Sequence, residues 1–141
     1  MKRLAVLVLV LGMIPLSAYS RERVYDETGK AREMKGLTLL YVDAGDKALE
    51  KLIDDEISVA APEIKLVEER EDAEFILRFR AFPIFQHDTG ARAYVLTRTK
   101  QNKNRLLWKT TDQSRWDAGA ERCAQSIAAR FVRAYRHAQS R

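Results

Sequence analysis

The sequence predicts an α+β domain: a two-layer sandwich in which two helices cover one face of a mostly antiparallel sheet of four to five strands. Several segments of strand length alternate apolar and polar residues, and two longer segments repeat apolar residues with the helical period. Each segment is apolar on one face only, so packing one layer of helices against one sheet is the economical way to bury these faces.

Residues 1–20 have the order of a secretory signal peptide. Lys2 and Arg3 precede an apolar run over residues 4–14, and Pro15 and small residues follow it. The run holds about eleven residues, roughly 17 Å as a helix, whereas crossing a bilayer takes nearer twenty. We expect cleavage near Ser20 and a periplasmic or secreted product with no transmembrane segment. An uncleaved N-terminal anchor is the alternative.

The mature chain divides into a lead and one domain. Residues 21–35 are polar without a sustained period and are expected to be a flexible lead or a short hairpin, with no assigned role. Residues 36–141 are expected to form a single α+β domain. Within it, residues 37–43 are an apolar run of strand length, stopped by Ala44 and Gly45.

Two amphipathic helices are expected. Asp46 is placed as the N-cap of the first, which ends before Pro62. Asp117 is placed as the N-cap of the last element, a helix of about twenty residues. Its apolar stripe is Ala120, Cys123, Ala124, Ile127, Ala128, Phe131, Tyr135 and Ala138.

The remaining segments read as strands. Residues 64–67 are a short candidate, and residues 73–85 form a long strand whose Pro83 indicates a sheet edge or a strand terminus. Residues 91–100 and 105–111 form a hairpin around residues 101–104. Alternation separates the two faces of each strand. In the long strand, Phe75, Leu77 and Phe79 lie on one face, and Ile76, Arg78, Arg80 and Phe82 lie on the other. In the hairpin, Ala93, Val95 and Thr97 lie opposite Arg92, Tyr94, Leu96 and Arg98, and Leu106 and Trp108 lie opposite Arg105, Leu107 and Lys109.

This order of elements resembles the small β-α-β-β-β-α domains of bacterial envelope proteins, such as the N-terminal domain of the Tol-system β-propeller protein. The likeness rests on the order itself, on Asp72-Ala73-Glu74 leading into Phe75-Ile76-Leu77, and on Leu106-Leu107-Trp108 in the late strand. The resemblance implies an envelope protein of this fold and no particular chemistry.

Charge is divided unevenly along the mature chain. Residues 21–77 hold 9 basic and 16 acidic residues, a net charge of −7, and residues 78–141 hold 14 and 4, a net charge of +10. Both halves carry dense apolar patterning, so they are expected to fold against each other and to neutralise part of this asymmetry internally.

Residues for catalysis or cofactor binding are scarce. The sequence has no nucleophile elbow, phosphate-binding glycine loop or metal-ligand motif, so no catalytic residue, cofactor or metal is assigned. His87, Asp88 and the loop near Asn102 are the only starting points for a hydrolase. Cys123 lies on the apolar stripe of the last helix and is expected to be core filler with a protonated thiol.

A basic sheet face is the one feature that suggests a binding site. If the apolar sides of the strands face the helices, six residues face outward as possible partner-binding residues: Arg78, Arg80, Arg92, Tyr94, Arg98 and Lys100, which Arg105 and Lys109 could join. Nucleic acid is not expected as a partner of an exported protein. An envelope protein or an anionic lipid or glycan fits such a face, and an ordinary solvated surface is the alternative.

The sequence therefore predicts an exported, non-catalytic binding or accessory module. A small envelope enzyme, such as a hydrolase, is one alternative. A structural or assembly subunit is another, in which the long strand ending at Pro83 pairs with another chain through an open edge.

Overall fold

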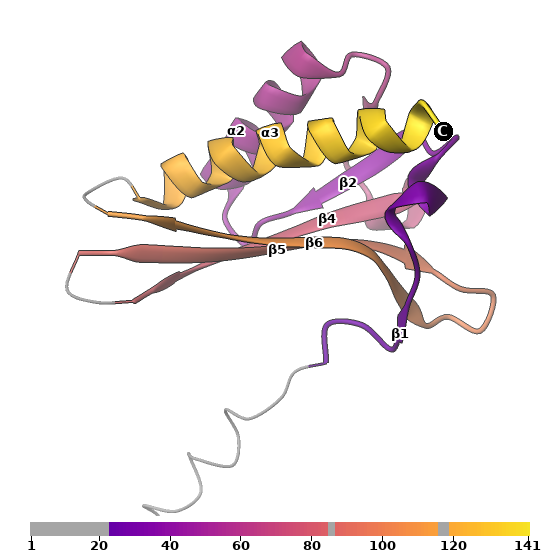
Figure 1. Ribbon diagram of the computed structural model, residues 1–141, viewed down its shortest axis with the longest axis horizontal. Helices are drawn as coiled ribbons and strands as arrows, with labels where there is room; N and C mark the ends of the chain where they lie inside the picture. The colour runs from indigo at the N-terminus through magenta and orange to yellow at the C-terminus, as the bar shows by residue number, and fades with distance from the viewer. Residues whose placement is uncertain (1–22, 85–86, 116–118) are drawn as a thin grey trace, which may run out of the picture.

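The computed structural model describes residues 23–84, 87–115 and 119–141, so the expected signal peptide and the expected Asp117 cap lie outside the described residues. Two helices cover one face of a six-stranded sheet, with strand order β1-β6-β5-β4-β2-β3 (Figure 1). The elements are β1 (Glu27–Thr28), the 3-10 helix η1 (Ala31–Met34), β2 (Leu39–Asp43), α2 (Lys47–Ala60), β3 (Lys65–Leu66), the 3-10 helix η2 (Arg70–Asp72), β4 (Phe75–Pro83), β5 (Thr89–Arg98), β6 (Asn104–Ser114) and α3 (Gly119–Gln139).

The α+β class and the single helical layer are as predicted, but the sheet is larger and more mixed than expected. Strand β4 pairs antiparallel with β5, and β5 with β6, whereas β2 runs parallel to both β3 and β4, and β1 runs parallel to β6. Strands β2 and β3 are parallel because α2, which connects them, returns the chain to the same end of the sheet. Strands β1 and β3 contain two residues each, too few to show alternation.

Helix α3 follows its predicted apolar stripe, and α2 has its predicted N-cap. The Asp46 carboxylate accepts hydrogen bonds from the backbone N–H groups of Ala48 and Leu49 at 2.8 and 3.1 Å, which caps α2 as expected. Helix α3 packs across β4, β5 and β6, and α2 packs beside it over β2 and β3. Beneath α3, the rings of Phe75, Phe131 and Tyr135 lie within about 6 Å of one another, at 6.2, 6.0 and 6.1 Å between centroids.

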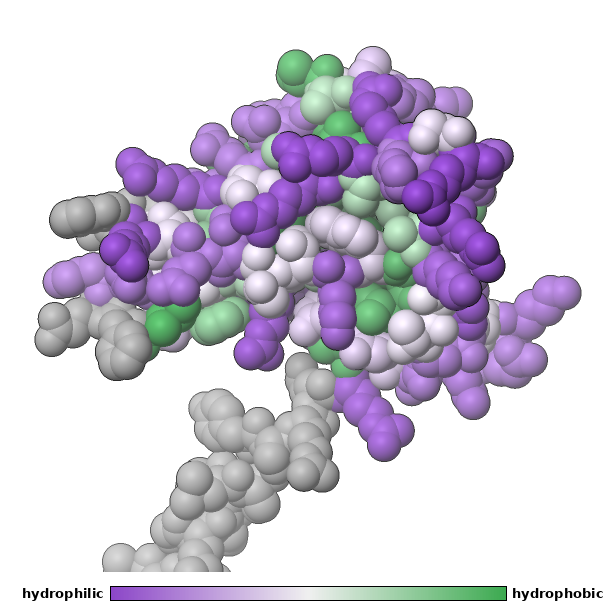
Figure 2. Space-filling model, viewed as in Figure 1, coloured by the Kyte–Doolittle hydropathy of each residue, from purple (hydrophilic) through white to green (hydrophobic). Residues whose placement is uncertain are grey.

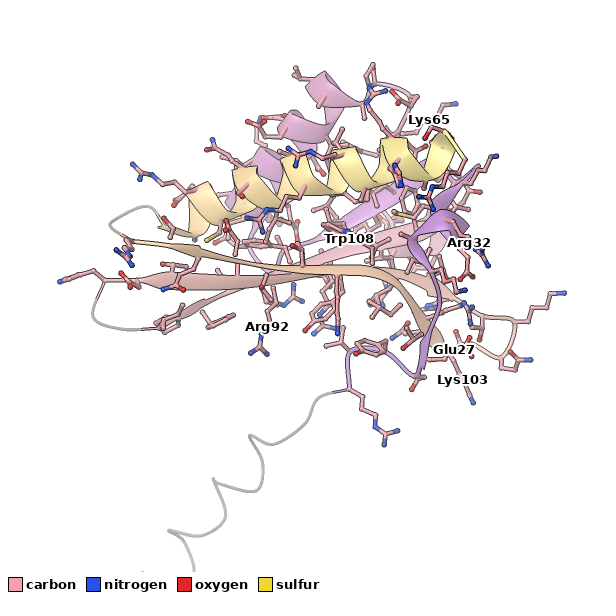
Figure 3. The ribbon with its side chains drawn as sticks, viewed as in Figure 1. Glu27, Arg32, Lys65, Arg92, Lys103 and Trp108 are labelled. Carbon is pink, nitrogen blue, oxygen red and sulfur yellow. The ribbon has the colours of Figure 1, made fainter. Side chains whose placement is uncertain are left out.

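A register shift in β6 changes one predicted face. Val95 pairs with Trp108 and Leu96 pairs with Leu106, so Leu107 is the extra residue of a bulge. The Trp108 ring lies 6.2 Å from that of Phe131, between the sheet and α3 (Figure 3), and Leu107 also lies in the main core. Leu106 lies on the opposite face. The prediction that Leu106 and Trp108 share a face is therefore wrong, because strict alternation cannot anticipate an inserted residue.

The segment predicted as a loose lead holds two elements. Strand β1 extends the sheet beyond β6, where the N–H of Gly29 donates to the oxygen of Leu106 at 2.6 Å. Element η1 then lies beside the end of α3, with Met34 fully buried. The Gln139 side chain bonds Met34 O and Gly36 N at 2.9 and 3.0 Å. Residues 23–36, hereafter the N-terminal strap, thus cross from one face of the sheet to the other (Figure 1).

Strand β4 lies between β5 and β2 as far as Arg78, so the open edge expected for assembly is restricted to the end of the strand. Pro83 is the last residue of β4, which confirms the strand terminus that the sequence offers as one of two roles for this proline. Beyond Arg78, β4 extends past the end of its pairing with β2. There the Arg80 guanidinium donates a hydrogen bond to the carbonyl oxygen of Phe79 at 2.7 Å. Pro83 has no N–H to donate. This short overhang is therefore protected against pairing with another strand.

Candidate functional site

The candidate site lies on the face of the sheet opposite the helices, hereafter the open face. Register brings its side chains together in rows across neighbouring strands. One row contains Arg78, Tyr94 and Lys109, and the next contains Arg80, Arg92 and Thr111. Figure 3 shows Arg92 projecting from this face, on the side away from the helices. The predicted outward positions of Arg78, Arg80, Arg92 and Tyr94 are confirmed.

Arg80 is committed to an internal contact. Its Nη2 lies 3.0 and 3.2 Å from the two carboxylate oxygens of Asp43, and its Nη1 donates to the carbonyl oxygens of Asp43 and Phe79 at 2.9 and 2.7 Å. These bonds join the end of β2 to β4. Arg78 is half-buried and also engaged within the protein. Neither guanidinium stands ready for a partner.

Other arginines of the basic half neutralise the acidic half, as the charge division predicts. Arg105 pairs with Glu33 at 2.9 Å and with Glu27 at 3.4 Å, and Arg136 pairs with Glu63 at 3.1 Å. The hydrogen bond from Arg105 holds the pKa of the Glu33 carboxyl below its ordinary value. Since Arg105 turns toward the N-terminal strap, it does not join the basic residues of the open face.

Arg92 and Lys109, two cations of the open face, have no carboxylate partner among the described residues, and they line one shallow groove of about 390 Å³. Arg92 lies 5.1 Å from the centroid of the Phe82 ring, a cation–π contact that leaves its N–H groups available. The Lys109 side chain makes no hydrogen bond or ion pair within the described part of the chain and is exposed. The complete lining of this groove, hereafter the open-face groove, is Tyr25, Arg92, Tyr94, Lys109, Thr110 and Thr111.

Tyr25 completes the groove from outside the predicted domain. The N-terminal strap carries its ring to 6.2 Å from that of Tyr94, tilted by 48°. Neither phenol hydroxyl has a hydrogen-bond partner within the described residues, so both are free to donate to a ligand. Sequence reasoning missed Tyr25 because nothing in a polar lead signals contact with a strand almost seventy residues later.

The two remaining predicted residues lie elsewhere. Arg98 ends β5, and Lys100 lies in the turn that follows it; both are exposed. At about 3.3 Å per residue, Arg98 is roughly 20 Å along β5 from Arg92. Leu96, which is buried, lies between them on the same face. The predicted basic face is therefore divided, and only Arg92 and Tyr94 of the predicted set share the groove.

The starting points for a hydrolase do not converge. His87 and Asp88 precede β5 and Asn102 follows it, so a ten-residue strand, about 30 Å long, separates them. Asn102 has a φ of 60°, which reflects its place in the tight β5–β6 turn. Cys123 is fully buried as predicted, and burial, reinforced by the Asp112 carboxylate, raises the pKa of its thiol.

A second concavity, of about 620 Å³, lies between α2 and strands β2 and β3. Two lysines and four carboxylates line it, and Lys51 pairs with Asp55 at 3.0 Å across one helical turn. Burial, with help from Glu50 and Asp55, raises the pKa of Asp54 to about 6. Because carboxylates outnumber lysines in this lining, the concavity is acidic, unlike the open-face groove.

The fold and the open-face groove define a small α+β domain with a basic, aromatic concavity on its sheet. No protein-family model and no curated protein matches the chain. Among solved structures, a DUF4136 family protein from Bacteroides thetaiotaomicron shares 6% sequence identity and a TM-score of 0.40, over 82% of this chain and 91% of that one.

Uncharacterised lipoprotein B from Nitrosomonas europaea shares 13% identity and a TM-score of 0.33, over 85% of each chain. At these values neither likeness informs the function of this chain. Within the described residues no helix has the length and apolar character to span a membrane. The functional conclusion therefore depends on the groove itself.

Proposed function

We propose that the protein is an exported, non-catalytic binding or accessory module that binds an anionic group in the open-face groove. One observation carries the proposal: Arg92 and Lys109 are drawn into one concavity without a carboxylate partner, whereas Arg80, Arg105 and Arg136 are each paired with one. Bringing like charges together has a cost in free energy, which a bound anion would offset.

The chemistry of the lining favours an anion over a neutral ligand. Arg92, Lys109 and two phenol hydroxyls offer hydrogen-bond donors, and no carboxylate or amide side chain lines the groove to accept in return. A phosphate or carboxylate is acceptor-only when ionised and matches such a lining. In the envelope, lipid headgroups, acidic glycans and acidic protein surfaces supply these groups.

Export is supported by the N-terminal sequence. The basic pair Lys2 and Arg3, the apolar run and the small residues before Ser20 have the order of a cleaved signal peptide. Mass determination of the protein from the cell envelope tests this directly. A mature chain beginning at or near Arg21 is expected, and a full-length chain would contradict it.

Binding is tested by titrating isotope-labelled residues 21–141 with glycerol phosphate and following backbone amide signals by NMR. We expect shifts concentrated on β5, β6 and Tyr25, and their loss when Arg92→Glu is combined with Lys109→Glu. The matched control combines Arg122→Glu with Arg133→Glu, which changes the net charge equally at exposed positions of α3. Equal effects of the two variants would show that only net charge matters and would refute the site.

A further inference from the structure

A patch of exposed apolar side chains adjoins the open-face groove. Among the described residues three large hydrophobic side chains are exposed, Val59, Phe82 and Ile84, and two of them line one concavity of about 450 Å³. This concavity, hereafter the apolar patch, is lined by Phe82, Ile84, Gly90, Ala91, Arg92, Thr111, Asp112 and Gln113. Figure 2 shows hydrophobic residues at the surface at the left of the view, where Figure 1 shows the ends of β4 and β5.

The apolar patch is built into the sheet. Phe82 pairs directly with Gly90, and a Cβ placed on Gly90 would lie 2.6 Å from Phe82 Cε2 and 2.8 Å from Ile84 Cδ1. Both side chains therefore lie on the bare backbone of the glycine. The N–H of Ile84 donates to Asp88 O at 3.0 Å, which fixes the start of the hairpin turn. The patch is held in place even though it is exposed.

The groove and the patch are continuous, because Arg92 and Thr111 line both. The guanidinium of Arg92 lies over the Phe82 ring, so cationic and apolar surface meet at one side chain. The nearest carboxylate in the lining, that of Asp112, accepts from Arg130 at 3.2 Å and does not neutralise Arg92. A ligand that uses the whole surface carries a negative group beside an apolar one.

We propose that the occupant is an anionic phospholipid at a bilayer surface. Its phosphate would lie against Arg92 and Lys109, and Phe82 and Ile84 would reach the boundary between headgroups and acyl chains. Cations beside aromatic and aliphatic side chains are typical of proteins that bind the surface of anionic membranes. A soluble sugar phosphate or an acidic glycan has no aliphatic chain to place against Ile84. This inference rests on the proposed anion-binding function and narrows it to one ligand class.

The test measures flotation of residues 21–141 with vesicles of pure phosphatidylcholine and with vesicles containing phosphatidylglycerol. Binding to the anionic vesicles alone is expected, weakening with added salt. Arg92→Glu with Lys109→Glu should lower the partition coefficient by about thirtyfold or more, since each basic residue near such a surface contributes about fivefold and reversal adds repulsion. Ile84→Ser should lower it about fivefold, and Arg122→Glu with Arg133→Glu by less than about threefold.

The outcomes separate this inference from the function on which it rests. If glycerol phosphate shifts the groove signals but anionic vesicles do not bind, or if Ile84→Ser binds vesicles as wild type does, the lipid inference is overturned and anion binding stands. If Arg92→Glu with Lys109→Glu changes neither the NMR titration nor the vesicle flotation, both the anion-binding function and the lipid inference are refuted. Circular dichroism of each variant confirms that it is folded, and a milder pair, Arg92→Gln with Lys109→Gln, replaces the reversal if it is not.

Discussion

Arg80 and Asp43 form a two-pronged contact, with Arg80 Nη2 3.0 Å from Oδ1 and 3.2 Å from Oδ2, just beyond the last registered pair of β2 and β4. The same guanidinium binds two backbone carbonyl oxygens. A residue that sequence alternation presents as an outward cation is in fact a clamp between two parallel strands. The Arg80 guanidinium therefore stabilises the fold. The guanidinium of Arg92, which is paired with Arg80 across β4 and β5, is available for binding.

Replacing Arg80 should therefore destabilise the fold. Arg80→Ala removes charge-assisted bonds from a half-exposed site, and we expect the free energy of unfolding to fall by about 1 kcal/mol. Urea denaturation measures the change. Arg92→Ala, on the same face, should change it by less than about 0.5 kcal/mol. Equal losses in the two variants would contradict the distinction between a clamp and a free cation.

Met34 anchors the N-terminal strap, and its truncation should loosen the groove as well as the core. Met34 is fully buried, so Met34→Ala should lower the free energy of unfolding by about 2–4 kcal/mol. Hydrogen exchange should quicken at the N–H of Gly29, which bonds β6. Lys35→Ala, an exposed neighbour, is the control. Unchanged exchange at Gly29 in the Met34 variant would show that β1 holds without its anchor.

Elements of the fold were predictable where a pattern repeats over many residues. Helix α3 shows its apolar stripe through five turns, and residues 75–82 alternate long enough to fix which side of β4 faces the core. Strands β1 and β3 have two residues each, and their pairing is decided by tertiary contacts that no local pattern records. The bulge at Leu107 is likewise invisible to alternation.

The site was predictable only in part, for the same reason. Alternation places Arg92 and Tyr94 outward, but it cannot tell a free cation from one that is paired with a distant carboxylate. Arg80 finds Asp43 on a strand that is remote in the sequence, and Tyr25 reaches Tyr94 through the strap. Charge division along the chain indicated that such pairs exist, without identifying them.

Tyr25 should contribute to ligand binding although it lies outside the predicted domain. Tyr25→Ala removes one wall of the groove, and we expect the dissociation constant for glycerol phosphate to rise about fivefold, as for loss of a hydrogen bond. Tyr25→Phe removes the hydroxyl and keeps the ring. A similar rise in the dissociation constant for this variant would assign the effect to the O–H donor. NMR titration measures both. Wild-type affinity in Tyr25→Ala would remove the strap from the site.

Asp54 should make stability depend on pH near neutrality. Burial beside Glu50 and Asp55 raises its pKa from 3.8 to about 6, so the folded chain holds this proton more tightly than the unfolded chain does. Linkage then requires stability to fall as pH rises from about 4 to about 6 and to stay lower above that. Asp54→Asn removes this loss. We expect the variant to exceed wild type by on the order of 1 kcal/mol at pH 7.5, after allowance for solvent screening.

The comparison with wild type at each pH isolates this group from carboxyls that act in the opposite sense. Hydrogen bonds lower the pKa of Glu74, and the contact with Arg105 lowers that of Glu33, so both contribute stability that is lost as pH falls. Because these terms are common to wild type and Asp54→Asn, the difference between the two unfolding curves reports Asp54 alone. Glu56→Gln, exposed on the same helix, is the matched control for removing one carboxylate from α2. An Asp54→Asn difference that stays constant from pH 4 to pH 7.5 would show that the carboxyl titrates alike in both states.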